Sequence, residues 1–220
     1  MTAQAGSVSS SEASTRPRAN PVLLVILGAA GLAMTVIMIS APTWVTYTTF
    51  QAPTIAAATL TGATFTFLGL YAFARRPDNR VGPLMMGVGF AFGAAMIGFI
   101  ENDATYTIGT FLLQDLWLAV LGHLFLAFPT GRLESRLDRG LVLTTYAWWF
   151  VREMLVLAFL DFRANGWAFD NVFLIQSNND LANAIGRVES VLTAGLTIAF
   201  LYALSLHWRR ATPAGRRVLA

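Results

Sequence analysis

The sequence contains no cysteine and no lysine, and only 12% of its 220 residues are charged. Without cysteine the chain has no disulfide, no thiolate nucleophile and no cysteine ligand for a metal. All 15 basic residues are arginines, which we interpret as a coding bias. Because soluble domains carry about 25% charged residues, a chain this poor in charge is expected to fold in lipid. Its net charge of only +3 is divided among short loops, so it lacks the contiguous basic surface that nucleic acid requires.

Hydrophobic residues, by contrast, make up 55% of the chain, and the mean hydropathy is +0.58. They form six apolar runs of about 20 residues, the length of a membrane-spanning helix: residues 21–40, 53–74, 81–100, 107–128, 141–160 and 188–207. We predict an all-α, polytopic helical membrane protein with about six transmembrane helices in one domain, residues 21–208, and the lipid bilayer as its partner. Residues 1–20 are predicted to form a disordered polar tail, and residues 209–220 a basic C-terminal segment.

A cleaved signal peptide is the alternative for residues 21–40. Their apolar run of about 18 residues is longer than the usual signal-peptide core of about 7–15 residues, which favours a retained helix.

The distribution of arginine predicts how the helices are oriented. Short cytoplasmic loops are enriched in positive charge, and the loops at residues 75–80 and 128–140 carry three arginines each. With both termini in the cytoplasm, two arginines, Arg163 and Arg187, lie outside and twelve lie inside. The twelve are Arg16, Arg18, Arg75, Arg76, Arg80, Arg132, Arg136, Arg139, Arg209, Arg210, Arg216 and Arg217. The prediction is a multi-pass protein of the plasma membrane, N-in/C-in.

Aromatic residues occur in two loops on the opposite side. The loop at residues 41–52 has no charge, and its aromatic residues are typical of anchors at the headgroup level. They are Trp44, Tyr47 and Phe50. The loop at residues 161–187 is predicted to lie on the membrane surface as a short amphipathic element, with a re-entrant segment as the alternative. Its aromatic residues are Phe162, Trp167, Phe169 and Phe173.

Asp115, Arg152 and Glu153 are the most informative polar residues inside the predicted spans. A charge near mid-bilayer costs about 3 kcal/mol on insertion scales, so such residues usually pair or face water. At 1.5 Å per residue, Asp115 lies about 12 Å from the outer end of its span and Arg152 about 16 Å from the inner end of its own. These depths match in a core about 30 Å thick.

We therefore predict a buried ion pair between Asp115 and Arg152, and the alternative is a ligand or proton site. Glu153 points about 100° away from Arg152 on an ideal helix, so we expect it to be protonated or to pair elsewhere.

His123 is a further polar candidate, eight residues after Asp115. Two widely separated histidines without cysteine do not make a metal site, so neither a metal nor a cofactor is predicted. We expect His123 to cap a helix end near the cytoplasm or to hydrogen-bond a neighbour. A role in pH sensing is the alternative.

Small residues recur at four-residue intervals in two helices, and small residues allow close helix approach. They are Gly89, Gly93, Ala94 and Gly98 in the third span, and Gly195, Ala199 and Ala203 in the sixth. We predict that they pack within one chain, and a homodimer through one of these faces is the alternative.

The predicted outer segments carry six carboxylates against two arginines. The carboxylates, the outer acidic face, are Glu101, Asp103, Asp161, Asp170, Asp180 and Glu189. The simplest explanation is that acids collect where arginine is excluded. The alternative is that this face attracts a cationic or amphipathic membrane-active stimulus, an attraction that salt would screen within about 8 Å.

Three segments carry a family resemblance. They are RRPDNRVGPLMMGVG (residues 75–89), FPTGRLESRLDR (residues 128–139) and HWRRATPAGRRVLA (residues 207–220). In this order they resemble the membrane sensor region of actinobacterial-type two-component sensor histidine kinases. The resemblance implies that further helices and a kinase module follow in cis and that a response regulator is the partner of the kinase. Residues 1–220 hold no phosphoacceptor histidine segment followed by ATP-binding boxes, so no catalytic activity is predicted for them.

Two functions of different classes therefore agree with the sequence. The first is the membrane-embedded signal-input domain of a sensor kinase. The second is a small membrane transporter, or a membrane subunit of one, that uses Asp115, Arg152 and Glu153. The lack of a repeat between the first and second three spans weakens the second. A structural membrane protein without a ligand is the third possibility.

Overall fold

The computed structural model describes residues 19–40 and 51–210. Every regular element within them is a helix, and six segments are long enough and apolar enough to cross a membrane. Most of the predicted tail, residues 1–18, lies outside the described residues. So do Trp44, Tyr47 and Phe50, together with the last ten residues of the basic C-terminal segment.

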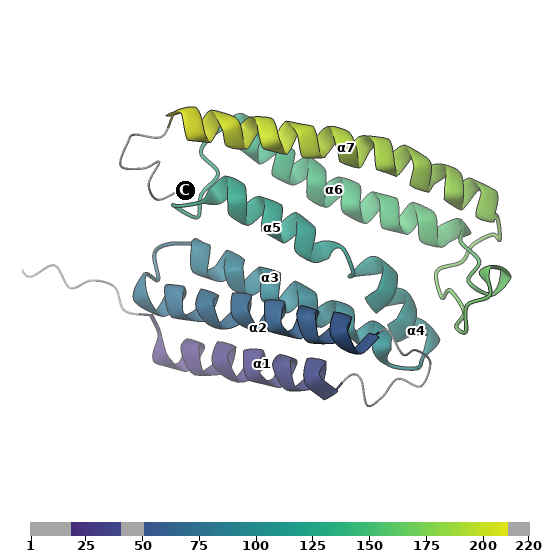
Figure 1. The fold of residues 1–220 in the computed structure, drawn as a ribbon, viewed down its shortest axis with the longest axis horizontal. Coiled ribbons are helices and arrows are strands. Elements are labelled where there is room, and N and C mark those ends of the chain that lie inside the picture. The colour runs from purple at the N-terminus through teal and green to yellow at the C-terminus, as the bar shows by residue number, and fades with distance from the viewer. Residues whose placement is uncertain (1–18, 41–50, 211–220) are drawn as a thin grey trace, which may run out of the picture.

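The helices lie side by side along the long axis of the molecule (Figure 1). α2 packs between α1 and α3, α3 contacts α5, and α6 packs on α7. The bounds are α1 Pro21–Ser40, α2 Gln51–Arg75, α3 Val81–Ala95, η2 Met96–Phe99, α4 Asp103–Tyr106, η3 Thr107–Leu112, α5 Leu116–Ala127, α6 Arg136–Phe159, η4 Arg163–Asn165 and α7 Asn179–Arg210. In the fourth span α4, η3 and α5 follow one another, and η2 completes the third.

Large apolar side chains cover the outside of these helices. Val25 of α1, Leu60 of α2 and Ile198 of α7 are examples, each more than 65% exposed. A soluble protein rarely exposes so much continuous apolar surface, whereas lipid tails solvate it at no cost. The six spans and this exterior are those of a multi-pass helical membrane protein, as predicted.

The two ends of the helix row differ in charge. The arginine end carries Arg75, Arg76, Arg80, Arg132, Arg136, Arg139 and Arg209, and the acidic end carries Glu101, Asp103, Asp161, Asp170 and Asp180. At the arginine end, Asn79 Nδ2 donates to the Pro129 carbonyl oxygen at 3.0 Å, which ties the two predicted inner loops together. Gly131 has a φ of 74°, and a Cβ there would lie 2.6 Å from the Arg80 nitrogen, so this position requires glycine.

The small residues of α3 are used for packing within the chain, as predicted. A Cβ on Gly89 would lie 2.8 Å from the Thr66 nitrogen of α2, and one on Gly93 would collide with Met34 of α1. On α7, Ala203 is buried against α5 and α6, but Gly195 is exposed with no atom within 4 Å of a Cβ position. The homodimer alternative stays a prediction for the exposed part of the α7 face.

Two helices begin earlier than predicted because capping residues start them. α6 begins at Arg136 rather than at residue 141, since the Ser135 and Asp138 side chains each accept a hydrogen bond from the other's backbone nitrogen. α7 begins at Asn179 rather than at residue 188, since Asn178 Oδ1 accepts from the Leu181 nitrogen at 3.1 Å. Asp180, Arg187 and Glu189 therefore lie on a helix, and the loop is shorter than expected.

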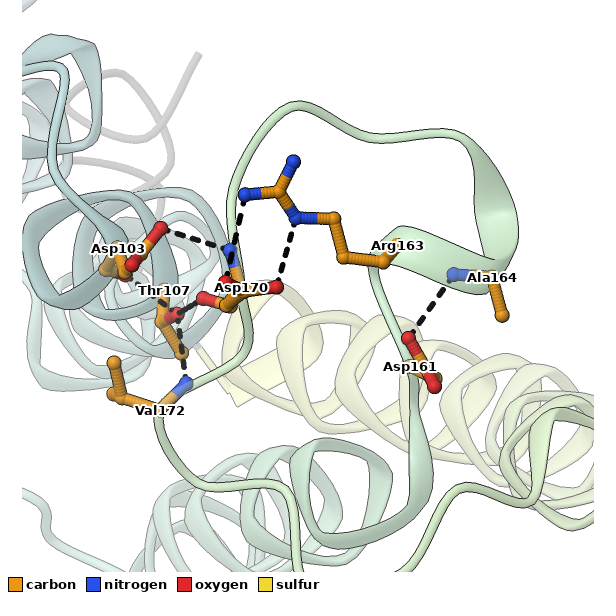
Figure 2. A network of polar contacts seen from close by, with 7 residues as sticks. All are labelled: Asp103, Thr107, Asp161, Arg163, Ala164, Asp170 and Val172. Carbon is orange, nitrogen blue, oxygen red and sulfur yellow. Dashed lines mark hydrogen bonds and ion pairs between the residues drawn. The ribbon is translucent and has the colours of Figure 1, made fainter.

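The loop at residues 160–178 folds across the acidic end. Arg163 Nε donates to Asp170 Oδ1 at 2.8 Å, and the Asp170 nitrogen donates to Asp103 Oδ1 at 2.8 Å (Figure 2). Thr107 Oγ1 lies 3.2 Å from the Asp170 carbonyl oxygen and accepts from the Val172 nitrogen at 3.4 Å. Three hydrogen bonds thus hold the loop on Asp103 of α4 and Thr107 of η3.

The aromatic residues of this loop do not form the predicted surface helix, and the loop holds no re-entrant helix. Phe162 is fully buried and stacks on Phe111 of η3 at 4.6 Å between ring centroids. Trp167 lies 5.2 Å from Phe111, and Phe169 lies 4.7 Å from Tyr106 of α4. The amphipathic prediction was wrong because η3 offers these rings an aromatic partner surface that the loop sequence alone does not reveal.

Candidate functional site

The fourth span is interrupted, and the interruption positions Asp115. The chain passes from α4 into η3, a π-helix, and turns at residues 113–115 before α5 begins at Leu116. π-helical segments are rare in proteins, and those that occur often lie at functional sites. Asp115 is the residue before α5 and makes no capping bond to that helix, so its carboxylate is available to a neighbouring helix.

Arg152 of α6 contacts three carboxylates from three elements. Its Nη2 lies 3.1 Å from Asp115 Oδ2, which confirms the predicted contact but not its burial, because the Asp115 side chain is 44% exposed. Its Nη1 lies 3.6 Å from Glu189 Oε2 of α7. Nη2 also contacts Glu153 Oε1. A guanidinium offers five N–H donors in a fixed plane, so one arginine can serve several acceptors. We call Asp115, Arg152, Glu153 and Glu189 the charged cluster.

The expectation that Glu153 points away from Arg152 was wrong. The two side chains are in contact, and the Glu153 side chain is only 3% exposed. The cluster grades from this buried carboxylate through Arg152 at 15% and Glu189 at 26% to Asp115 at 44%. It therefore reaches from the interior to the surface.

The charged cluster lies between two cavities that differ in character. The polar cavity, of about 600 Å³, extends toward the acidic end, and Thr110, Gln114, Asn183 and Ser190 contribute to its wall. The apolar cavity, of about 350 Å³, extends toward the arginine end between α5, α6 and α7. Its apolar wall is made by Leu118, Leu121, Phe125, Trp148, Trp149, Leu196 and Phe200. Asp115, Arg152 and Glu189 line both.

Close packing ends the apolar cavity toward the arginine end. Leu126, Leu141, Val142 and Ala203 form a buried core there, and Tyr146, Phe200 and Leu204 pack against it. A Cβ on Gly122 would lie 2.9 Å from the Phe200 ring, so α5 and α7 touch at this level. The cavity is therefore closed toward the arginine end.

Two indole nitrogens in the wall have no hydrogen-bond partner. Nε1 of Trp148 and Nε1 of Trp149 are both buried and unpaired, and both residues line the apolar cavity. Buried N–H groups are nearly always satisfied in native proteins. The wall of this cavity therefore has unused donors.

A second polar contact links α6 and α7 at the arginine end. His207 Nε2 lies 3.2 Å from Asp138 Oδ2, and the Asp138 side chain is only 1% exposed. The same carboxylate accepts from the Ser135 nitrogen at 3.1 Å, so it belongs to the cap of α6. Asp138 was not among the predicted site residues, although the Ser-x-x-Asp pattern at residues 135–138 is a signal of a capped helix start.

The other predicted site residues lie apart from the charged cluster. His123 packs edge-on against Tyr146, with ring centroids 6.1 Å apart, and lines neither cavity. Of the outer acidic face, Asp103 and Asp170 hold the loop, and Asp180 lies in the first turn of α7, where the helix dipole favours an acid. Only Glu189 belongs to the cluster, a role that the prediction of a later helix start concealed.

Asp161 has a structural role in the same loop. Its carboxylate accepts from the Ala164 nitrogen at 3.0 Å, as Figure 2 shows. This backbone bond, helped by the Ser177 hydroxyl, lowers the pKa of Asp161 below its ordinary value. Glu101 also takes part in an interaction, so the face is not a set of free charges.

In residues 19–40 and 51–210, no group of three or more histidine, aspartate or glutamate side chains has an arrangement that would hold a metal ion. In the charged cluster the reason is visible, because the Arg152 guanidinium occupies the space between the three carboxylates. Comparisons with protein families, with curated proteins and with solved structures find no match for this chain.

Proposed function

We propose that residues 1–220 are a signal-input domain in which α7 transmits a displacement from the charged cluster to the arginine end. The observation that carries this proposal is the continuity of α7, which runs without interruption from Asn179 to Arg210. It holds Glu189 in the charged cluster and His207 against Asp138. The two residues are about 27 Å apart at 1.5 Å per residue.

The packing of α7 suits a moving element. α7 rests mainly on α6 and touches α5 at few points, and most of its outer side chains are exposed. Two side-chain contacts, Arg152–Glu189 and Asp138–His207, link its middle and its C-terminal end to α6. At its start, Asn179 Oδ1 accepts a hydrogen bond from the Asp161 nitrogen at 2.8 Å, just after the end of α6. An event that weakens the first contact changes the balance of forces on the second, because a helix moves as a nearly rigid rod.

The resemblance of the loops to sensor kinases gives the direction of output. The segments at residues 75–89 and 128–139 meet at the arginine end through the Asn79–Pro129 contact, and His207, the first residue of the third segment, joins them through Asp138. We place the arginine end and both termini in the cytoplasm of the plasma membrane, because positive charge is retained there. A kinase module in cis after α7, acting on a response regulator, would then receive the displacement directly.

A transporter is the second candidate, because two cavities meet at an intramembrane charged cluster. Charges at this depth often mark ion or proton paths. The close packing of Leu126, Leu141 and Val142 beneath the apolar cavity supports the sensor instead, since it leaves a dead-end site.

The experiment measures whether the two ends of α7 are coupled. Because the chain has no cysteine, Leu143→Cys and Leu201→Cys provide unique spin-label sites on exposed faces of α6 and α7. In lipid nanodiscs, Glu189→Gln should shift the distance between these labels by about 1–2 Å, the scale of helix shifts in switches. Asp180→Asn is the matched control, since it removes an exposed carboxylate of α7 outside the cluster and should leave the distance unchanged.

Labels at Val25→Cys and Leu68→Cys report on α1 and α2, which should not move in either variant. Equal label distances in Glu189→Gln and Asp180→Asn would contradict the sensor proposal. Solute-driven ion flux into proteoliposomes that is abolished by Asp115→Asn would establish the transporter in its place.

A further inference from the structure

We propose that α5, α6 and α7 form a binding site for an amphipathic cation, an ammonium group on a medium-length apolar chain. The ammonium group would lie at the charged cluster and the chain in the apolar cavity. The proposal rests on the proposed function only in making this molecule the signal; the binding itself is an independent claim.

The charge of the cluster selects a cation. Three carboxylates stand against two arginines, Arg152 within the cluster and Arg187 in the wall of the polar cavity, which leaves a formal excess of one negative charge beside a low-dielectric cavity. Arg152 contacts Glu189 at 3.6 Å, the longest of its three contacts. Glu189 and the half-exposed Asp115 therefore keep acceptor capacity for an ammonium donor, and charge-assisted hydrogen bonds of this kind are the strong ones.

The shape and wall of the apolar cavity select a chain rather than a bare ion. From the level of Asp115 to Phe125 the α5 backbone rises about 15 Å, and aromatic and aliphatic side chains line this length. The rings of Trp148 and Trp149 belong to the wall, and aromatic side chains provide a large apolar surface for a chain to pack against.

The cavity has an entrance for such a molecule. On α5, Leu118 and Phe125 line the cavity and are about half exposed, and on α7 Thr193 and Thr197 line it and are exposed. The opening therefore lies between α5 and α7, on the apolar flank of the protein. An amphiphile dissolved in the bilayer would reach it laterally, chain and head group together.

Occupancy would act on α7 through competition. An ammonium group that binds Glu189 replaces one of the two polar contacts between α6 and α7, while Arg152 keeps Asp115 and Glu153. A ligand shifts an equilibrium only by its differential affinity for the two states. Here the two states differ in the partner of Glu189, which is Arg152 in the empty state and the ammonium group in the occupied state.

Equilibrium binding of decylammonium to the full chain in zwitterionic nanodiscs tests the site. Decanol and decanoate have the same chain with a neutral and an anionic head, and empty nanodiscs give the partitioning background. We expect saturable decylammonium binding with at least about tenfold preference over decanol, the scale of one charge-assisted hydrogen bond.

Variants with matched controls locate the binding. Asp115→Asn and Glu189→Gln should each weaken decylammonium binding about tenfold, whereas Asp180→Asn should not change it. Thr197→Trp fills the apolar cavity and should abolish binding. The adjacent Ile198→Trp places the same ring on the exposed face of α7, 68% exposed in the native chain, and should leave binding intact.

Equal binding of decanol and decylammonium, or equal loss in Thr197→Trp and Ile198→Trp, overturns the proposal and assigns the cavity to bilayer lipid. The proposed function fails separately. Site-specific decylammonium binding without a change in the Leu143–Leu201 label distance keeps the site and removes the signalling role. A label shift in Glu189→Gln without decylammonium binding does the reverse.

Discussion

Arg152 is the residue on which the charged cluster depends, because Asp115, Glu153 and Glu189 share it as a partner. Their environments differ: Glu153 is buried, whereas Asp115 is 44% exposed and can exchange its partner for water. Removing the cation leaves a buried carboxylate uncompensated, and removing one exposed carboxylate does not. The cluster is therefore energetically asymmetric, which a symmetrical two-residue ion pair would not be.

Arg152→Met should destabilise the protein by about 3–5 kcal/mol, the cost of leaving a buried charge unpaired. Asp115→Asn should cost only about 1 kcal/mol, the net contribution of one hydrogen bond, because Arg152 keeps Glu153 and Glu189 as partners. Adding Glu153→Gln to Arg152→Met should recover part of the loss, since the buried charge is then removed as well. Reversible unfolding in mixed micelles, followed by circular dichroism, compares the native protein, the three single variants including Glu153→Gln, and the double variant. Strictly additive effects of the two substitutions would show that the side chains do not interact.

The lowered pKa of Asp161 leads us to expect that the local stability of the loop at residues 160–178 depends on pH. Its pKa is lowered in the folded state, chiefly by the Ala164 N–H. A group with a depressed folded pKa stabilises the fold above its unfolded pKa of about 3.9, and this contribution is lost as the pH falls through the folded value. Hydrogen exchange at the Ala164 amide should therefore accelerate as the pH is lowered below about 4. In Asp161→Asn this acid-dependent increase, corrected for intrinsic exchange, should be absent.

At the scale of elements, hydropathy alone located the six spans, because each needs a long apolar run and little else. It did not locate the starts of α6 and α7, where Ser135 and Asn178 extend the helices through polar sequence. Nor did it reveal the turn at residues 113–115, because the mean hydropathy of the span stays high although Gln114 and Asp115 are polar. Matched depth was enough to predict the Asp115–Arg152 contact.

Hydropathy and depth could not predict the position of Glu189 or of the aromatic loop. Their positions follow from contacts with η3 and α6, which depend on how distant elements pack. Glu189 was assigned to an outer face because the start of α7 was placed too late, and that single boundary moved it away from its partner Arg152. A local sequence window contains neither the helix cap nor the partner.

Because α2 and α3 are in close contact, alanine substitutions at two glycines should differ sharply in their effect on stability. A Cβ on Gly69 would lie 2.6 Å from the Met86 nitrogen and 2.8 Å from the Gly82 carbonyl oxygen, both rigid backbone atoms. Gly69→Ala should therefore force the helices apart and cost about 1–3 kcal/mol, the scale of overpacking. Gly195→Ala meets no neighbour, so it should be neutral or stabilise by up to about 1 kcal/mol through helix propensity. The same unfolding assay compares them, and equal stability of the two variants would rule out the close α2–α3 approach.

The whole molecule is a row of six spans with opposite charge at its two ends, so one orientation experiment decides the membrane placement of every element. The arginine end is expected in the cytoplasm because retained positive charge determines topology in short loops. Contacts across that end, Asn79–Pro129 and Asp138–His207, make the ends of α2, α5 and α7 reach the same side together.

Reporter fusions after Arg76, Arg136 and Arg210 should therefore be active only as cytoplasmic reporters, and fusions after Asp103 and Asn171 only as external ones. Replacing Arg132, Arg136 and Arg139 with glutamine removes three of the positive charges that determine orientation. Part of the population should then insert in the opposite orientation. The matched control, Arg163→Gln with Arg187→Gln, removes charge from the acidic end and should strengthen the native orientation. A cytoplasmic signal at Asn171 together with an external one at Arg136 in the native chain would reverse the molecule, placing the charged cluster and its polar cavity toward the cell interior.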